Sequence, residues 1–269
     1  FTTEDVEYLR HGDTAYLATV YRPRGAGPFP ALLNVHGGAW GGGDRLMNHV
    51  VDEALAASGI VVAAIDFRSS HEAPYPASLQ DVNYATRWLK AHAADFGGSP
   101  ERVGVIGFSS GGHLAMLSAM RHNDARYAAL PLLEAPDLDA AAAYVIMGWP
   151  VIDPLSRFRF AQAKGAQPHV DAGIRYFGDE AGMEEANPQM LLERGEEVAM
   201  PPALLVQGSD DAALTPGMAE RFVETYAKAG GVIELGLYPG APHGFMREGG
   251  PNADRAIEQV KGFIARQLA

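Results

Sequence analysis

The sequence predicts an α/β fold in which a mostly parallel eight-stranded sheet is flanked by helices. Short apolar runs alternate along the chain with segments of helical periodicity, as in strands joined by crossover helices. The runs in the middle of the chain are almost continuously apolar, which parallel strands covered on both faces require. With 269 residues, of which 47% are hydrophobic, the chain suits one large α/β domain, and we expect a single domain over residues 1–269.

The first two strands are expected to pair in an antiparallel hairpin. Residues 6–9 and 14–20 are apolar runs joined through Gly12-Asp13, which is a turn signal. Six further strands are predicted at residues 31–35, 60–65, 103–106, 144–147, 203–206 and 232–237.

Helices are expected between these runs. A segment that begins at Pro76 and ends at Gly97-Gly98 has apolar residues on one face, namely Leu79, Val82, Ala85 and Leu89. The last helix has the same property, with Ile257, Val260, Ile264 and Leu268 at spacings of three and four. These helices provide the cover that the sheet needs.

One stretch, about residues 154–198, is too long for an ordinary connection between two strands. It is rich in aromatic and other large apolar residues, including Phe158, Phe160, Tyr176 and Phe177. We interpret it as a small helical insertion that covers the site like a lid. The alternative is a set of surface helices with an ordinary packed face.

Composition excludes several classes of function. The net charge is −12 and no run of Lys or Arg occurs, which disfavours nucleic-acid binding and adsorption to anionic membranes. No apolar stretch reaches the length of a membrane span, and no signal-peptide pattern is present. The absence of cysteine excludes disulfides, thiolate catalysis and zinc–thiolate sites. We expect a cytoplasmic protein, although the chain begins at Phe1 rather than Met, so a removed leader and secretion also fit; a homodimer is compatible with the sequence.

The run Gly107-Phe108-Ser109-Ser110-Gly111 follows a predicted strand and leads into a helical segment. This layout is typical of a nucleophile elbow, in which a serine on a sharp strand-to-helix turn exposes its Oγ. Glycines two residues before and after the serine let neighbouring backbone pass closely. The alternative is a Gly/Ser turn whose serine caps the helix. Ser109 is therefore the candidate nucleophile.

A general base is expected after the nucleophile, and His243 lies in a loop just after the last predicted strand. Histidine suits this role because its ordinary pKa is near neutrality. The acid is expected at the carboxyl end of an intervening strand, where Asp210 and Asp211 follow residues 203–206. We favour Asp211, with Asp210 as an N-cap or turn residue and Asp153 as a third candidate.

An oxyanion hole is expected in the loop after the strand at residues 31–35, in the run His36-Gly37-Gly38-Ala39-Trp40. Backbone N–H groups of Gly38 and Ala39, with Gly37 beside them and the N–H of Ser110, would stabilise a developing oxyanion. A phosphate-binding loop is excluded because no Gly-Lys-Ser/Thr ending follows, and no dinucleotide fingerprint is present.

With these motifs in this order, the sequence resembles the α/β-hydrolase superfamily over essentially its full length. The resemblance is to esterases with His-Gly-Gly-x-Trp or His-Gly-Gly-Gly before Gly-x-Ser-x-Gly. That group includes hormone-sensitive-lipase-like carboxylesterases, acetyl-xylan and feruloyl esterases, and kynurenine formamidase-like enzymes. It implies Ser109 as nucleophile, His243 as base and Asp211 as orienting acid, without a metal or cofactor. Phe108 and Ser110 at the elbow, and Ala39 in place of a third glycine, depart from the hormone-sensitive-lipase-like pattern.

We therefore expect a serine hydrolase that cleaves small to medium carboxylic esters through an acyl-serine intermediate. An amide hydrolase with the same triad is the first alternative, and a non-catalytic small-molecule-binding member of the fold is the second. Five further side chains are candidates for the substrate pocket, although the aromatic ones are also plausible core residues: Trp40, His71, Phe108, Trp149 and Tyr176.

Overall fold

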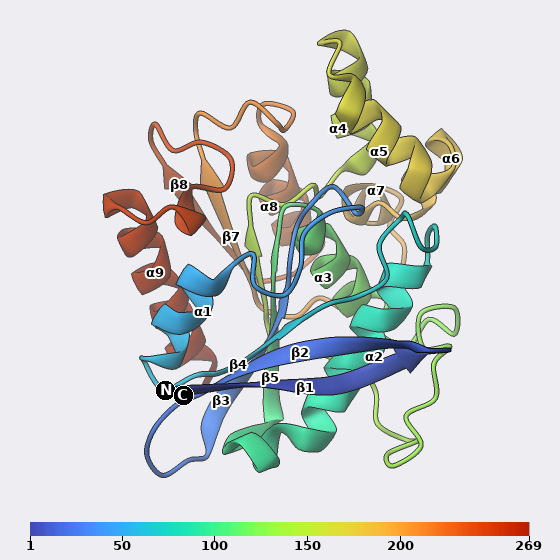
Figure 1. Ribbon diagram of the computed structural model, residues 1–269. Helices are drawn as coiled ribbons and strands as arrows, with labels where there is room; N and C mark the ends of the chain where they lie inside the picture. Colours follow the sequence, from blue (N-terminus) through green and yellow to red (C-terminus); the bar gives the residue numbers. More distant parts are fainter. Residues whose placement is uncertain (269) are drawn as a thin grey trace.

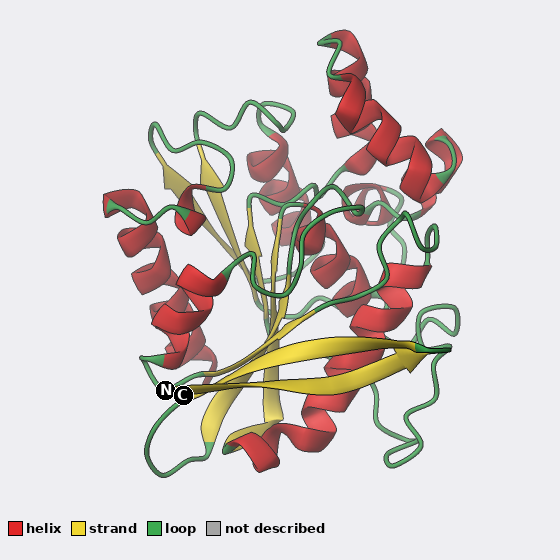
Figure 2. Ribbon diagram, in the orientation of Figure 1, coloured by secondary structure: helices red, strands yellow, loops and turns green. Residues whose placement is uncertain are grey.

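The computed structural model describes residues 1–268, which are built around one eight-stranded sheet (Figure 2). Its strands are β1 (Thr2–His11), β2 (Thr14–Arg22), β3 (Phe29–Val35), β4 (Val61–Ile65), β5 (Gly98–Phe108), β6 (Val145–Gly148), β7 (Ala203–Gly208) and β8 (Ile233–Tyr238). They are ordered β1-β2-β4-β3-β5-β6-β7-β8, and every pair from β4 to β8 is parallel. The predicted eight-stranded, mostly parallel sheet is confirmed.

β1 and β5 exceed by the most residues the apolar runs that predicted them. β1 extends from Thr2 to His11 because it pairs with β2 along its whole length, mostly through exposed residues. β5 begins at Gly98 because that residue pairs with Phe29 at the start of β3. Backbone pairing between neighbouring strands thus lengthens elements whose ends are polar and carry no apolar signal.

Helices cover both faces of the sheet (Figure 1). On one face α1 and α9 lie together, and α2, α3 and α8 cover the other. Their bounds are α1 (His49–Ala56), α2 (Ala77–His92), α3 (Ser110–Met120), α8 (Met218–Lys228) and α9 (Pro251–Leu268). Because both faces are covered, every residue of β4 and of β7 is buried, which explains their nearly continuous apolar sequence.

The stretch predicted to be a helical insertion contains four helices, α4 (Pro154–Ala163), α5 (Gln167–Phe177), α6 (Glu180–Glu185) and α7 (Pro188–Glu193). α4, α5 and α6 extend beyond one end of the sheet (Figure 1). Three of the helices begin after a capping residue: the side chains of Asp153, Asp179 and Asn187 each accept a hydrogen bond from a backbone N–H of the following turn. A proline in the first turn favours α4 and α7 further.

The parallel arrangement places the loops after β3, β5, β7 and β8 at one edge of the sheet. In open α/β sheets, this carboxyl edge is where ligands bind. Among residues 1–268, no helix is both long and apolar enough to cross a membrane.

Candidate active site

Ser109 lies on the sharp turn between β5 and α3. Its backbone has φ 55° and ψ −121°, which is a strained conformation for a residue with a Cβ. Ser109 occupies the N-cap position of α3, but its side chain makes no capping hydrogen bond. The hydroxyl is instead 2.9 Å from His243 Nε2. The geometry therefore differs from a serine that merely caps a helix.

The two glycines of the elbow are required by close backbone contacts. A Cβ on Gly107 would lie 2.2 Å from the carbonyl oxygen of Gly111. A Cβ on Gly111 would lie 2.2 Å from the carbonyl oxygens of both Val35 and His36. These distances are shorter than any van der Waals contact, so only glycine lets the end of β3 pack against the elbow.

Ser109, His243 and Asp211 form one hydrogen-bonded chain, although they are far apart in the sequence. His243 Nδ1 is 2.7 Å from Asp211 Oδ2, and Nε2 is 2.9 Å from Ser109 Oγ. An ionised carboxylate only accepts, so Nδ1 carries the proton and Nε2 is free to accept from the serine hydroxyl. The Asp211 side chain is 3% exposed and that of His243 is 27% exposed, so the carboxylate is shielded from solvent and the imidazole is partly exposed.

Asp211 accepts hydrogen bonds from two groups in addition to the imidazole. The Gln207 side chain donates to Oδ2 at 3.0 Å, and the Ala213 N–H donates to Oδ1 at 2.9 Å. Burial raises the pKa of Asp211, but the His243 contact, together with these two donors, outweighs burial and lowers the pKa overall. Gln207 was not predicted as a site residue, because a glutamine at the end of a strand matches no known motif.

The other two candidate acids lie elsewhere. The Asp210 carboxylate accepts from the Ser209 hydroxyl and is exposed. Asp153 is buried at the start of α4, where it accepts from Asn187 Nδ2 at 2.8 Å and caps the helix. Neither carboxylate contacts His243, so the structure brings Asp211 alone of the three to the imidazole.

The loop after β3 has three successive residues with positive φ: Gly38 at 109°, Ala39 at 51° and Trp40 at 60°. A bulky residue rarely adopts this conformation, so the loop is strained. The Trp40 N–H donates to Ser110 Oγ at 3.1 Å, which ties the loop to the elbow. Within residues 1–268, the N–H groups of Gly38 and Ala39 donate to no protein group.

Trp40 also connects this loop to the insertion through His113 of α3. The indole Nε1 donates to His113 Nδ1 at 3.2 Å, so His113 carries its proton on Nε2, which donates to the Ala186 carbonyl at 2.7 Å. Burial lowers the pKa of His113 to about 4, so the ring is neutral at pH 7. The Trp40 ring further stacks on Tyr176 of α5, with centroids 5.5 Å apart.

The structure places four of the five candidate pocket residues in the core. Trp40, Phe108, Trp149 and Tyr176 are each 2% exposed or less. His71 is exposed and lies beside Gly41, which follows the loop expected to form the oxyanion hole. Burial fits the core interpretation of the four aromatic residues, and contact with substrate stays a prediction.

Arg247, a residue that the sequence did not single out, lies behind the elbow. A Cβ on Gly37 would be 3.0 Å from Arg247 Nη2 and 3.1 Å from Ser109 Cβ. The guanidinium is held by Asn48, whose Oδ1 accepts from Nε at 3.0 Å. Nη2 is buried without a partner in the described residues, and burial lowers the pKa of Arg247. A cation thus stands beside the loop expected to form the oxyanion hole.

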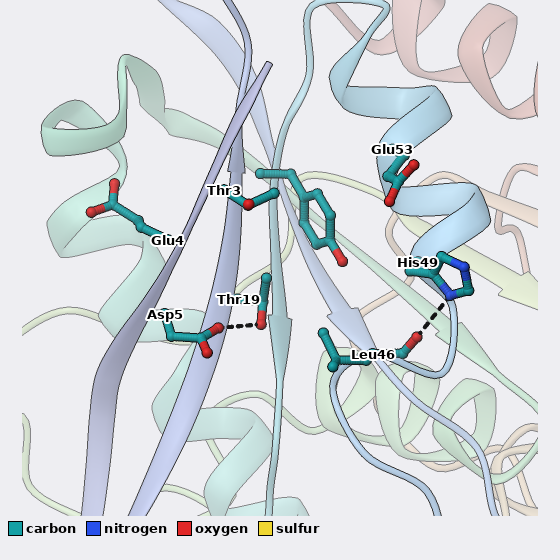
Figure 3. A pocket seen from close by; sticks show the side chains of 8 residues that line it. Thr3, Glu4, Asp5, Thr19, Leu46, His49 and Glu53 are labelled. Atoms are coloured by element: carbon teal, nitrogen blue, oxygen red, sulfur yellow. Dashed lines mark hydrogen bonds between the residues drawn. The ribbon is translucent and has the colours of Figure 1, made fainter.

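A separate surface cavity of about 640 Å³ lies between the β1–β2 hairpin and α1 (Figure 3). It is lined by Asp5 and Thr19 from the hairpin and by His49 and Glu53 from α1. The Thr19 hydroxyl donates to Asp5, which also pairs with Arg45, and His49 Nδ1 contacts the backbone carbonyl of Leu46. The cavity includes no residue of the Ser109 chain.

The sequence and the fold have clear counterparts among known proteins. Esterase LipC of Mycobacterium tuberculosis is 33% identical over 87% of this chain and 58% of its own length. The probable carboxylic ester hydrolase LipM of the same organism is 27% identical over 98% of this chain and 61% of its own length. The chain thus spans about three-fifths of the length of these two relatives.

Solved structures of esterase 2 from Thermogutta terrifontis match almost the whole chain. The form phosphoramylated by tabun gives a TM-score of 0.76 at 26% identity and covers 98% of this chain and 94% of that one. The propionate-bound form gives a TM-score of 0.75 at 26% identity with the same coverage. The expected α/β-hydrolase fold is confirmed. The BD-FAE family model matches residues 19–225, and the chain therefore belongs to the BD-FAE family of the α/β-hydrolase superfamily.

Proposed function

We propose that this chain is a serine carboxylesterase that hydrolyses small-molecule esters through an acyl-serine intermediate. The observation that carries the proposal is the hydrogen-bonded chain from Asp211 through His243 to the strained Ser109. His243 Nε2 takes the hydroxyl proton as Ser109 Oγ attacks the ester carbonyl, and Asp211 stabilises the imidazolium that forms. The same proton then goes to the departing alcohol, and water attacks the acyl-serine by the reverse sequence.

The N–H groups of Gly38, Ala39 and Ser110 form the oxyanion hole in this proposal. The Gly38 and Ala39 groups have no acceptor among the described residues, and the Trp40–Ser110 hydrogen bond holds their loop at the elbow. Removing one such donor costs about 3 kcal/mol of transition-state stabilisation in comparable sites. The strain at Ala39 and Trp40 is consistent with a loop positioned for this role.

Short acyl groups are the proposed substrates. The matching esterase from Thermogutta terrifontis has been solved with propionate and with butyrate bound. Here the large aromatic side chains around the elbow are packed in the core, with Phe108 and Trp149 no more than 1% exposed. This close packing leaves little room for a long acyl chain and therefore favours short ones.

The test is hydrolysis of p-nitrophenyl esters from acetate to octanoate by wild type, Ser109→Ala and the surface control Ser58→Ala. We expect the highest kcat/KM on acetate to butyrate, full activity in the control, and loss of activity in Ser109→Ala. Paraoxon should add a diethylphosphoryl group to Ser109, detectable by peptide mass spectrometry; the Thermogutta esterase has been solved in a paraoxon-phosphorylated form. Equal rates in wild type and Ser109→Ala, or a label on another residue, would overturn the proposal.

A further inference from the structure

Arg157 is a buried cation in the helical insertion, close to the candidate active site. It lies on α4, is 5% exposed, and stands 5.9 Å from the centre of the Trp40 ring. Its Nη1 donates to the backbone carbonyl of His169 at the start of α5 at 3.3 Å. α4 and α5 extend beyond the end of the sheet at which β5 turns into the elbow (Figure 1). The guanidinium therefore lies between the insertion and the oxyanion loop.

The guanidinium of Arg157 is poorly satisfied by the protein. It has five N–H donors, yet one long hydrogen bond is its sole polar contact within residues 1–268. Nε is buried without a partner, and no carboxylate in the described part of the chain comes within ion-pair distance. By contrast, Arg159 on the same helix is exposed and pairs with Glu180 at 2.6 Å.

Leaving such a cation buried and unpaired is unfavourable unless something else supplies the counter-charge. The chain has 33 acidic residues, so the sequence contains many carboxylates that could have paired with this arginine. The contact with the Trp40 ring offers a cation–π interaction, but this leaves the N–H donors in the guanidinium plane unmet. The vacant donors match a carboxylate, which guanidinium binds through two parallel hydrogen bonds.

The charge of Asp211 acts on Arg157, and the charge of His243 acts on His169, the hydrogen-bond partner of Arg157. Burial lowers its pKa to about 10, and the Asp211 carboxylate opposes that shift, so the group is cationic at neutral pH. The pKa of His169 is lowered by burial and further by the charges of Arg157 and His243. Asp211, the acidic group that acts on Arg157, is already paired with His243. Asp211 thus acts on the charge of Arg157, but its pairing with His243 leaves the guanidinium without an ion-pair partner in the described residues.

We propose that Arg157 binds a carboxylate carried by the substrate, so that the preferred substrates are short esters with a free carboxylate group, such as monoesters of dicarboxylic acids. This inference rests on the proposed esterase function and names its substrate class. The bound carboxylate anchors one end of the molecule on α4 while its ester carbonyl lies at Ser109. In a protein of net charge −12, a local cation is needed to attract such an anion.

The test compares pairs of esters that differ only in carboxylate against carboxamide. Monoethyl glutarate and ethyl glutaramate place the group on the acyl side. The acetate esters of 3-hydroxypropanoate and of 3-hydroxypropanamide place it on the alcohol side. In wild type, kcat/KM for the carboxylate should exceed that for the amide by about tenfold or more in at least one pair.

Arg157→Gln should bring that ratio to about one, mainly through KM, while activity on the amide persists, and Arg157→Lys should retain part of the preference. Arg159→Gln, which removes an exposed charge from the same helix, should leave the ratio unchanged. A wild-type ratio at or below one in both pairs overturns the inference without any variant. An equal loss on both members of a pair in Arg157→Gln also overturns it, since a merely structural role predicts that result.

Activity on p-nitrophenyl acetate separates this inference from the proposed function. If wild type hydrolyses that ester and Ser109→Ala does not, the esterase function holds and the paired ratios judge Arg157 alone. If wild type hydrolyses neither p-nitrophenyl acetate nor any of the paired esters, the proposed function itself fails.

Discussion

Replacing Asp52 with asparagine should remove a pH dependence of stability that this buried carboxyl group imposes. Asp52 lies on α1, is 0% exposed, and has one oxygen, Oδ2, without a partner in the described residues. Burial raises its pKa to about 8, which the hydrogen bond from Asn34 opposes and the neighbouring charge of Glu53 reinforces. The folded protein therefore holds a proton on Asp52 at a pH where the unfolded chain, with a pKa of about 3.9, has lost it.

The sign and size of the effect follow from proton linkage. Between about pH 4 and pH 8 the folded state binds one proton more than the unfolded state, so the free energy of unfolding falls as pH rises. One proton gives a slope of at most about 1.4 kcal/mol per pH unit, or on the order of 5 kcal/mol over the window. Above about pH 8 both states are charged and the contribution is flat.

The assay is urea unfolding of wild type and Asp52→Asn at intervals from pH 5 to pH 9. The difference in free energy of unfolding, variant minus wild type, should grow with pH up to about pH 8 and then level off. Glu101→Gln is the control, because Glu101 is an exposed carboxylate on β5, whereas Glu53 itself acts on the pKa of Asp52. If the difference stays constant across this range, Asp52 has no raised pKa in the folded protein and the reasoning is refuted.

Two further predictions concern the site. Asp211→Asn should lower kcat by about 10⁴-fold, because His243 loses the acceptor that fixes its tautomer, while Asp210→Asn should retain near-full activity on p-nitrophenyl acetate; comparable losses in both variants would contradict the assignment. Gly111→Ala should destabilise the protein by about 3 kcal/mol or more in urea unfolding and abolish activity, because its Cβ would lie 2.2 Å from two carbonyl oxygens. Gly262→Ala, inside α9 where the added Cβ would make only an ordinary contact with Arg266 Nη1 at 3.5 Å, should instead stabilise by about 0.5–1 kcal/mol, and similar stability changes in the two glycine variants would argue against the elbow packing.

The polar chain that ends at Arg247 shows how Asp52 is connected to the elbow. Asp52 accepts from Asn34, Asn34 Oδ1 accepts from Asn48 Nδ2 at 3.2 Å, and Asn48 Oδ1 accepts from Arg247. Three of these polar side chains, Asp52, Asn34 and Asn48, are buried. This series of hydrogen bonds holds the Arg247 guanidinium against Gly37. Buried polar networks of this kind are rigid only when their members stay paired.

The sequence by itself determined the strands of the sheet and the order of the chemical groups. Buried parallel strands need apolar residues on both faces, so β4 and β7 stand out as runs with almost no polar residue. The elbow also has a local signature, because strand, tight turn and helix are consecutive in the chain and Gly107 must be glycine to clear the carbonyl oxygen of Gly111, four residues later. Such features depend on neighbours within about ten residues, and the sequence shows them directly.

Tertiary structure decided the rest, because burial and pairing depend on residues distant in the chain. Asp211 and Asp210 are adjacent and chemically identical, and only the position of His243, 32 residues later, separates them. Trp40 and Tyr176 look equally suited to a pocket or a core until their stacking in the core is seen. Arg157 has no motif at all, since an arginine on an amphipathic helix is ordinarily exposed and paired. Its isolation arises only where α4, α5 and the loop after β3 meet, and the free energy of a buried charge is set by that whole environment rather than by its sequence neighbours.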